Sequence, residues 1–151
     1  MAAMVNPFDL KTVLLAKHAQ HVVLVHFPIA LFISAVGFDF AAQRTKSIAL
    51  AAAARYNLTV AAVATLPVVA TGLLAWQWRL GGHKLKGILL QHLVLGVVSS
   101  VLIWLVWWVH FRARHKDGPL PAYRLPIELM AAVAIATTAH LGGFLSGVNA
   151  P

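Results

Sequence analysis

The stretch ILLQHLVLGVVSSVLIWLVWWVHF (Ile88–Phe111) contains no Asp, Glu, Lys or Arg. The hydrocarbon core of a bilayer is about 30 Å thick, and about 20 apolar residues cross it as a helix. This stretch therefore predicts a transmembrane helix. Three further segments are long and apolar enough to predict the same, although each contains one charged residue: residues 22–42 with Asp39, 58–80 with Arg79 and 125–148 with Glu128.

The composition of the whole chain agrees with a membrane protein. Of the 151 residues, 60% are hydrophobic and only 11% are charged, whereas soluble domains carry about 25% charged residues. A soluble domain of this length has too little interior to bury so much apolar surface. Because the connections are short, we expect an all-α integral membrane protein, an up-down-up-down four-helix bundle formed as one domain by residues 1–151, without an internal repeat.

The charge and the cysteine count exclude several classes of protein. The net charge is +8, but the basic residues lie in short segments between apolar runs, where they contact lipid headgroups and set topology rather than bind nucleic acid. Five of them lie on the side of the membrane that carries both termini, here called the terminal side, and seven on the opposite, distal side. This asymmetry favours a cytoplasmic distal side, with both termini outside. The absence of cysteine excludes iron–sulfur clusters, thiolate zinc sites and c-type haem attachment.

Histidines inside the spans are the main functional candidates, since ionisable groups are costly within a membrane. His26 and His92 each lie about four residues inside a span from the terminal side, and His140 lies about seven residues from the end of its span. At 1.5 Å per residue, their depths differ by only about 5 Å. His21 lies one turn further out and is expected to face away from these three, unless Pro28 disturbs the helix.

Small residues accompany the three histidines along their helices. Ala30, Gly96 and Ala136 each lie one turn deeper than a histidine. Small residues mark faces where membrane helices approach closely, so we expect the histidines to point into the bundle. Their size also leaves clearance for a flat macrocycle, which favours a porphyrin-type ligand over a bare ion.

These residues predict a b-type haem protein that acts as an electron-transfer subunit rather than as a stand-alone enzyme. His92 and His140 are the preferred axial pair, and His26 is a third ligand or a supporting hydrogen-bond donor. Arg79, at the terminal rim, is a candidate partner for the haem propionates. Other membrane redox subunits or a second copy of the chain are the expected protein partners.

The carboxylates lie at the other end of the spans. Asp39 and Glu128, together with His110, are on the distal side, about a membrane thickness away from the other histidines. A mixed His/carboxylate di-iron site, which helix bundles build from Glu and Glu-x-x-His motifs, is therefore not expected.

Three alternatives remain open from the same residues. Imidazoles of His26, His92 and His140, with His21 as a fourth, could hold copper or zinc. The spacing Ala136-x-x-x-His140 is similar to chlorophyll ligation in light-harvesting helices. The chain could also be a non-enzymatic structural subunit of a larger membrane complex, with histidines that only form hydrogen bonds within the bundle.

The opening HVVLVHFPIAL (His21–Leu31) resembles that of a bacterial family of small four-helix predicted membrane proteins, catalogued as a domain of unknown function. Val22 stands where that family has proline, and Ala75 where it commonly has Asp. The resemblance implies a bacterial inner membrane location and, because some relatives are joined to haem- or metal-binding electron carriers, a redox setting. Further matching residues are Gly72, Trp76, His92 and Gly142-Gly143-Phe144-Leu145.

Overall fold

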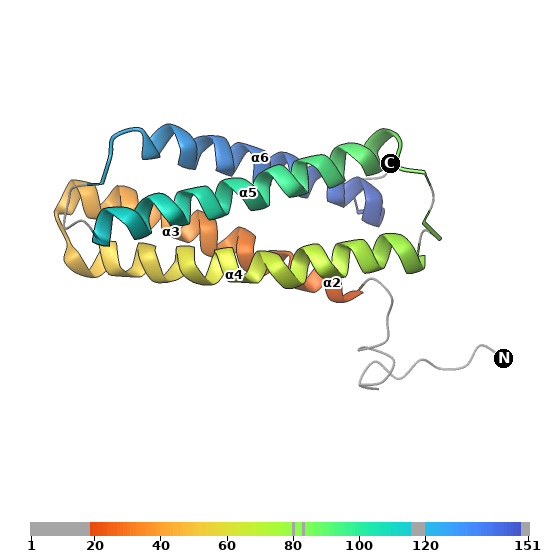
Figure 1. The fold of residues 1–151 in the computed structure, drawn as a ribbon, viewed down its shortest axis with the longest axis horizontal. Helices are drawn as coiled ribbons and strands as arrows, with labels where there is room; N and C mark the ends of the chain where they lie inside the picture. The colour runs from red at the N-terminus through yellow and green to blue at the C-terminus, as the bar shows by residue number, and fades with distance from the viewer. Residues whose placement is uncertain (1–18, 80, 83, 116–119, 149–151) are drawn as a thin grey trace.

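The protein is an all-α bundle of four apolar helices. The computed structural model describes residues 19–79, 81–82, 84–115 and 120–148. Helix α3 packs mainly against α4, and α5 against α6, so the bundle consists of two antiparallel hairpins (Figure 1). The helices are α2 (Ala19–Leu24), α3 (His26–Thr45), α4 (Ile48–Arg79), α5 (Gly87–His115) and α6 (Arg124–Ser146).

Four helical segments are long and apolar enough to cross a membrane, as predicted. The second begins at Ile48, well before residue 58, where the sequence predicted its start. Residues 49–54 are ALAAAA, and because alanine is the strongest helix former, α4 continues through the interface instead of ending there. The segments are Gln20–Thr45, Ile48–Trp78, Gly87–Ala113 and Arg124–Ser146.

The helical hydrogen-bond ladder of the first span is broken between α2 and α3. Val25, three residues before Pro28, lies in the turn between the two helices. It keeps helical backbone angles, and its N–H donates to the carbonyl oxygen of His21 at 3.0 Å. Proline has no N–H, so Pro28 cannot donate the helical hydrogen bond to the carbonyl of Leu24. The break separates His21, on α2, from His26, the first residue of α3.

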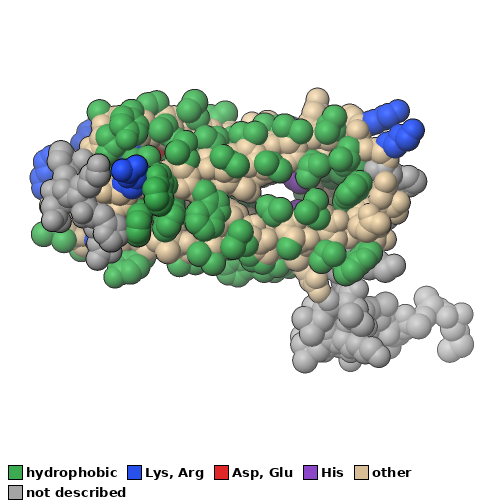
Figure 2. Space-filling model, viewed as in Figure 1, with side chains coloured by type: hydrophobic (Ala, Val, Ile, Leu, Met, Phe, Trp, Pro, Cys, Tyr) green, Lys and Arg blue, Asp and Glu red, His purple; other side chains and the backbone are tan. Residues whose placement is uncertain are grey.

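The outer surface of the bundle is apolar and faces lipid. Leu129 and Val133 of α6 are more than 60% exposed, and hydrophobic side chains cover the visible face while Lys and Arg gather at its ends (Figure 2). No water is available in the bilayer core, and the helices satisfy their own backbone groups there. The chain is therefore a multi-pass membrane protein.

The tightly packed core occupies only one half of the bundle. We call the half next to the α3–α4 and α5–α6 connections the distal half, and the half next to the α4–α5 connection the terminal half. Among the described residues, none is buried on α4 after Thr65, on α5 before Ser99 or on α6 after Ile135. The core residues are Phe32, Ala35, Leu58, Ala61, Ala62, Ile103, Val106, Ala131 and Ile135.

The two hairpins bury equivalent positions. Most buried residues of α3 have a buried counterpart 71 residues later in α5, and most buried residues of α4 have one 70 residues later in α6. The sequence AAVA occurs at both 61–64 and 131–134. The two hairpins thus share one burial pattern. The pairs are Phe32 and Ile103, Ala35 and Val106, Asp39 and His110, Leu58 and Glu128, Ala61 and Ala131, and Thr65 and Ile135.

Candidate functional site

The distal half contains a buried ion pair between the two hairpins. Arg124 Nε of α6 donates to Asp39 Oδ2 of α3 at 3.0 Å, and Gln43 Nε2 donates to the same oxygen at 2.8 Å. Asp39 and Arg124 are only 2% and 5% exposed. Each charge therefore has a direct partner, which is the condition for keeping charged groups inside an apolar bundle.

A second polar pair lies beside the first. His110 Nε2 of α5 is 2.9 Å from Glu128 Oε1 of α6, and both side chains are buried. Among the described residues, the only buried side-chain nitrogen or oxygen without a hydrogen-bond partner is Glu128 Oε2. Asp39, His110 and Glu128 each offer a ligand atom, and these atoms lie within 4.8 Å of one another. The three side chains form what we call the distal cluster.

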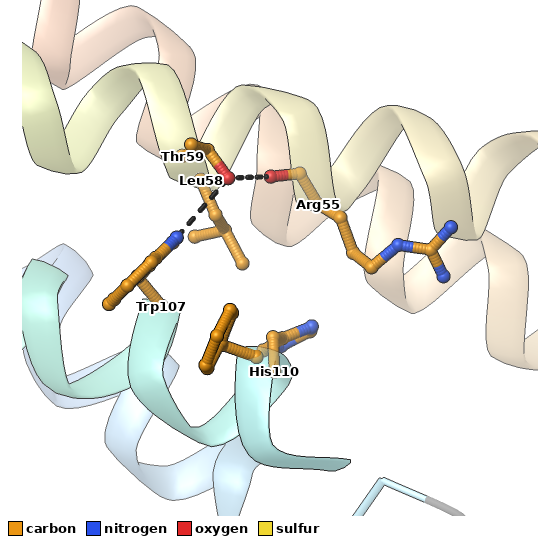
Figure 3. A pocket seen from close by; sticks show the side chains of 6 residues that line it. Arg55, Leu58, Thr59, Trp107 and His110 are labelled. Atoms are coloured by element: carbon orange, nitrogen blue, oxygen red, sulfur yellow. Dashed lines mark hydrogen bonds between the residues drawn. The ribbon is translucent and has the colours of Figure 1, made fainter. Parts of the chain in front are cut away.

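A small pocket between α4 and α5 reaches this cluster. Its volume is about 50 Å³, enough for a few water molecules. Figure 3 shows Arg55 extending from α4 on the side where His110 lies, while the Trp107 ring closes the other side. Trp107 Nε1 donates to Thr59 Oγ1 at 3.2 Å, which fixes the indole across the two helices.

The terminal half is open instead of packed. Figure 2 shows an opening through the molecule in this half, with histidine side chains at its edge. The interior faces of α4 and α6 carry glycine at this level, Gly72 and Gly142. The open space and the small side chains make this half the candidate binding site for a cofactor.

His21 of α2 lies on the interior face and contacts α4. Its Nδ1 is 3.1 Å from the carbonyl oxygen of Val68 and 3.4 Å from Thr71 Oγ1. A Cβ added to Gly72 would lie 2.9 Å from His21 Cε1, so glycine is required for this approach. His21 therefore faces α4, and not away from the bundle as expected for a helix that Pro28 leaves undisturbed.

His92 of α5 makes the corresponding contact with α6. Its Nδ1 is 3.0 Å from the carbonyl oxygen of Thr138, and a Cβ added to Gly142 would lie 3.2 Å from its Cε1. Ser99, two turns further along α5, contacts Thr138 Oγ1 at 3.1 Å. The predicted inward orientation of His92 agrees with these contacts.

The contacts of His21 and His92 are equivalent. The histidines are 71 residues apart, and the two glycines are 70 residues apart, as are the two carbonyl acceptors. In each hairpin the acceptor lies four residues before the glycine, one helical turn away. Because a backbone carbonyl only accepts hydrogen bonds, each imidazole carries its hydrogen on Nδ1. The two hairpins thus repeat one arrangement, which we call the twin histidines.

The family model described as "Predicted membrane protein (DUF2231)" matches residues 17–149. The chain belongs to this family. The match confirms the resemblance seen in the first motif and covers both twin histidines and all of the distal cluster. No curated protein and no solved structure matches the chain.

In this DUF2231 protein, His26 and His140 do not lie on the interior face. His26 is exposed and precedes the buried Pro28 by two residues, about 200° of helical rotation. His140 is also exposed. It lies two residues after Thr138, which faces α5, so its side chain is likewise about 200° from the packed face. The His140 ring packs edge-on against Phe144, with centroids 5.0 Å apart. The structure therefore corrects the predicted inward orientation of both histidines.

The remaining predicted residues have mixed placements. Gly96 is half-buried and faces α6, with Thr138 Cγ2 3.9 Å from its added Cβ, so it permits close helix packing. Ala136 is exposed on the outer face, near Leu129 and Val133. Helix α4 ends at Arg79, and the side chain of Arg79 lies outside the described part of the chain.

Sequence reasoning missed the role of His21 and the closeness of the distal cluster. A signal for the first was available, because His21 precedes Pro28 by seven residues, two helical turns that return to the same face. For the second, Asp39 and Glu128 were placed on the distal side together with His110. These three side chains meet only because each helix turns the face that carries them toward the bundle axis. The sequence alone did not define those faces.

Proposed function

We propose that this protein binds b-type haem in the terminal half of the bundle, where His21 and His92 would hold it, and acts as a membrane electron-transfer subunit. The observation that carries the proposal is the twin arrangement. Each hairpin supplies one imidazole from its first helix, and an imidazole from each side is the ligand set of a bis-histidine b-type haem. The pair replaces His92 and His140, because His140 is on the outer face.

The hydrogen bonds of the twin histidines support a ligand role. A neutral imidazole with its hydrogen on Nδ1 carries its lone pair on Nε2, which binds iron or another metal. A hydrogen bond from Nδ1–H to a backbone carbonyl is the usual support of a ligating histidine, and it fixes both the tautomer and the ring orientation. Val68 and Thr138 supply these carbonyls at 3.1 and 3.0 Å.

The surroundings of the twin histidines fit a large apolar cofactor. The terminal half has an opening (Figure 2) and glycines against which the two histidine rings lie closely, and the described part of this half buries no carboxylate. Haem when bound would supply one-electron chemistry, and the bundle would keep water away from its iron. Lys84 and Lys86 are exposed beside the α4–α5 connection and, with Arg79, are the proposed partners of the propionates.

The proposed setting is the bacterial inner membrane, with the terminal side outside. The larger number of basic residues on the distal side favours this orientation. A haem near the outer surface would exchange electrons with a carrier or a redox subunit on that side. Copper, zinc and chlorophyll are the alternative ligands of the imidazoles, and metal analysis and pigment extraction distinguish them.

The test is the haem content of purified variants. His21→Ala and His92→Ala should each lose at least nine-tenths of the haem of the wild-type protein, measured as the pyridine haemochrome. His26→Ala and His140→Ala are matched controls, because these histidines are on the outer face. Both control variants should keep the haem content of the wild-type protein. Loss in the controls together with retention in His21→Ala and His92→Ala would contradict the assignment.

A second candidate function, a structural subunit of a larger membrane complex, is favoured by the outer face of α3. His26, Ala30, Ser34 and Gly37 are all exposed on one stripe, and small residues allow another membrane helix to approach closely. Under this function the purified protein would be colourless and would co-purify with partner subunits. A haem spectrum in the isolated protein would exclude this candidate as a complete account.

A further inference from the structure

The distal cluster lies outside the proposed haem site and has its own unexplained chemistry. Asp39, His110 and Glu128 come from α3, α5 and α6, and they are 2%, 3% and 1% exposed. His110 is eighteen residues beyond His92 on the same helix, which separates the two sites by about 27 Å. The cluster therefore cannot share a ligand with the twin histidines.

The two carboxylates of the cluster do not have equivalent partners. Arg124 pairs with Asp39, whereas the buried carboxylate of Glu128 has only the imidazole of His110 beside it. A buried carboxylate requires a positive partner or hydrogen bonds in an apolar interior. A divalent cation between Asp39 and Glu128 would give both carboxylates such a partner.

Glu128 provides an independent sign of a missing ligand. Its Oε1 contacts His110, so the carboxylate already faces the cluster. Its Oε2 is buried and has no hydrogen-bond partner among the described residues. Buried polar atoms nearly always have a partner, and an exception indicates an unseen water molecule or ion.

Two neighbouring side chains fix the orientation of the Asp39 carboxylate by hydrogen bonds, as is common for carboxylates that bind a metal. Arg124 Nε and Gln43 Nε2 both donate to Oδ2, so neither occupies the other carboxylate oxygen. Hydrogen bonds of this kind orient a metal ligand and are typical of the shell around metal sites. Access to the cluster is available from the pocket lined by Arg55, Trp107 and His110.

We propose that Asp39, His110 and Glu128 bind one divalent first-row transition-metal ion. One imidazole nitrogen and two carboxylate oxygens suit zinc, manganese or iron(II) rather than copper(I) or calcium. Their ligand atoms already lie within 4.8 Å of one another, so small side-chain movements complete the site. The ion would connect the first hairpin, through Asp39, to the second, through His110 and Glu128.

Zinc binding by the full chain tests the proposal. Protein stripped with a chelator and equilibrated with Zn²⁺ in detergent should retain one ion per chain by elemental analysis. Glu128→Gln preserves the size of the side chain and should weaken binding at least tenfold by isothermal titration calorimetry. His26→Ala is the control, because it removes an exposed histidine outside the cluster, and it should leave the stoichiometry unchanged.

Two further variants separate the possible reasons for a loss of zinc binding. The double variant His21→Ala/His92→Ala abolishes the proposed haem site and should still bind zinc, so failure of one site is distinguishable from failure of the other. If Glu128→Gln does not elute as a folded species, His110→Asn provides the second test of the same ligand set. Absence of stoichiometric zinc in the wild-type protein, or equal affinity in a folded ligand variant, overturns the proposal.

Discussion

The two halves of the bundle are formed by the same two hairpins, but their interiors differ in packing. In the distal half the interior is filled by Phe32, Leu58 and their neighbours. There Arg124 pairs with Asp39 across the hairpins, and His110 pairs with Glu128 within the second hairpin. In the terminal half no described residue of α4, α5 or α6 is buried, and two imidazoles rest on glycines. The distal half thus has the packing that stabilises the fold, while the terminal half has the open space that the proposed function assigns to a ligand.

Arg124→Ala should give the largest loss of stability, because it leaves Asp39 buried without its positive partner. We expect the free energy of unfolding to fall by about 3–5 kcal/mol, measured by thermal denaturation in detergent. Arg44 is exposed and lies 4.7 Å from the centroid of the Phe40 ring, so Arg44→Ala should cost at most about 1 kcal/mol. Equal effects of the two substitutions would show that the buried pair does not stabilise the distal half.

Leu58→Ala and Leu73→Ala test packing in the two halves with the same chemical change. Leu58 is 1% exposed and Leu73 is 44% exposed, and both are on α4. Truncation of a packed leucine costs about 2–5 kcal/mol, so Leu58→Ala should be clearly destabilised. Leu73→Ala should change stability by less than about 1 kcal/mol, since lipid replaces the lost side chain. A larger loss for Leu73→Ala would mean that the terminal half is packed.

Gly72→Ala and Gly142→Ala test the twin arrangement. The added methyl group would lie 2.9 Å from the His21 ring and 3.2 Å from the His92 ring, so each ring must move. We expect overpacking to cost about 1–3 kcal/mol, with the larger effect and the greater loss of haem in Gly72→Ala. Gly37→Ala is the control, because no atom lies within 4 Å of its added Cβ. If both variants matched Gly37→Ala in stability and haem content, the close approach of the histidines would be refuted.

Thr65→Val should give the smallest effect. Thr65 Oγ1 accepts a hydrogen bond from Trp104 Nε1 at 3.0 Å, between the hairpins. Hydrogen bonds between membrane helices contribute about 0.6 kcal/mol on average, so stability should fall by about that amount. Tryptophan fluorescence should shift as the indole loses its partner. An unchanged emission spectrum would indicate that this bond is not formed in the bilayer.

The sequence predicted the fold well because long uncharged segments have only one stable arrangement in a bilayer. Residues 88–111 had to be a helix crossing the membrane, and short connections made its neighbours antiparallel. The start of α4 was missed because the alanines at 49–54 extend the helix beyond the predicted span. The shared burial pattern was missed because the hairpins share burial positions more than amino acids.

The site was predicted only in part, because helical phase depends on which face packs. Small residues occur both at helix contacts and toward lipid, so Ala30 and Ala136 gave the wrong orientation for His26 and His140. His92 was correctly placed on the interior face. Pairing of Asp39 with Arg124, 85 residues away, depends on three-dimensional packing that the spacing of charges does not reveal.

The most direct test of the account is the visible spectrum of the purified wild-type protein, recorded before and after reduction with dithionite. We predict a sharp reduced α-band of b type in the wild-type protein, absent from both His21→Ala and His92→Ala. A colourless wild-type protein, or an α-band that survives both substitutions, would contradict the claim that the two hairpins hold one haem between their equivalent histidines.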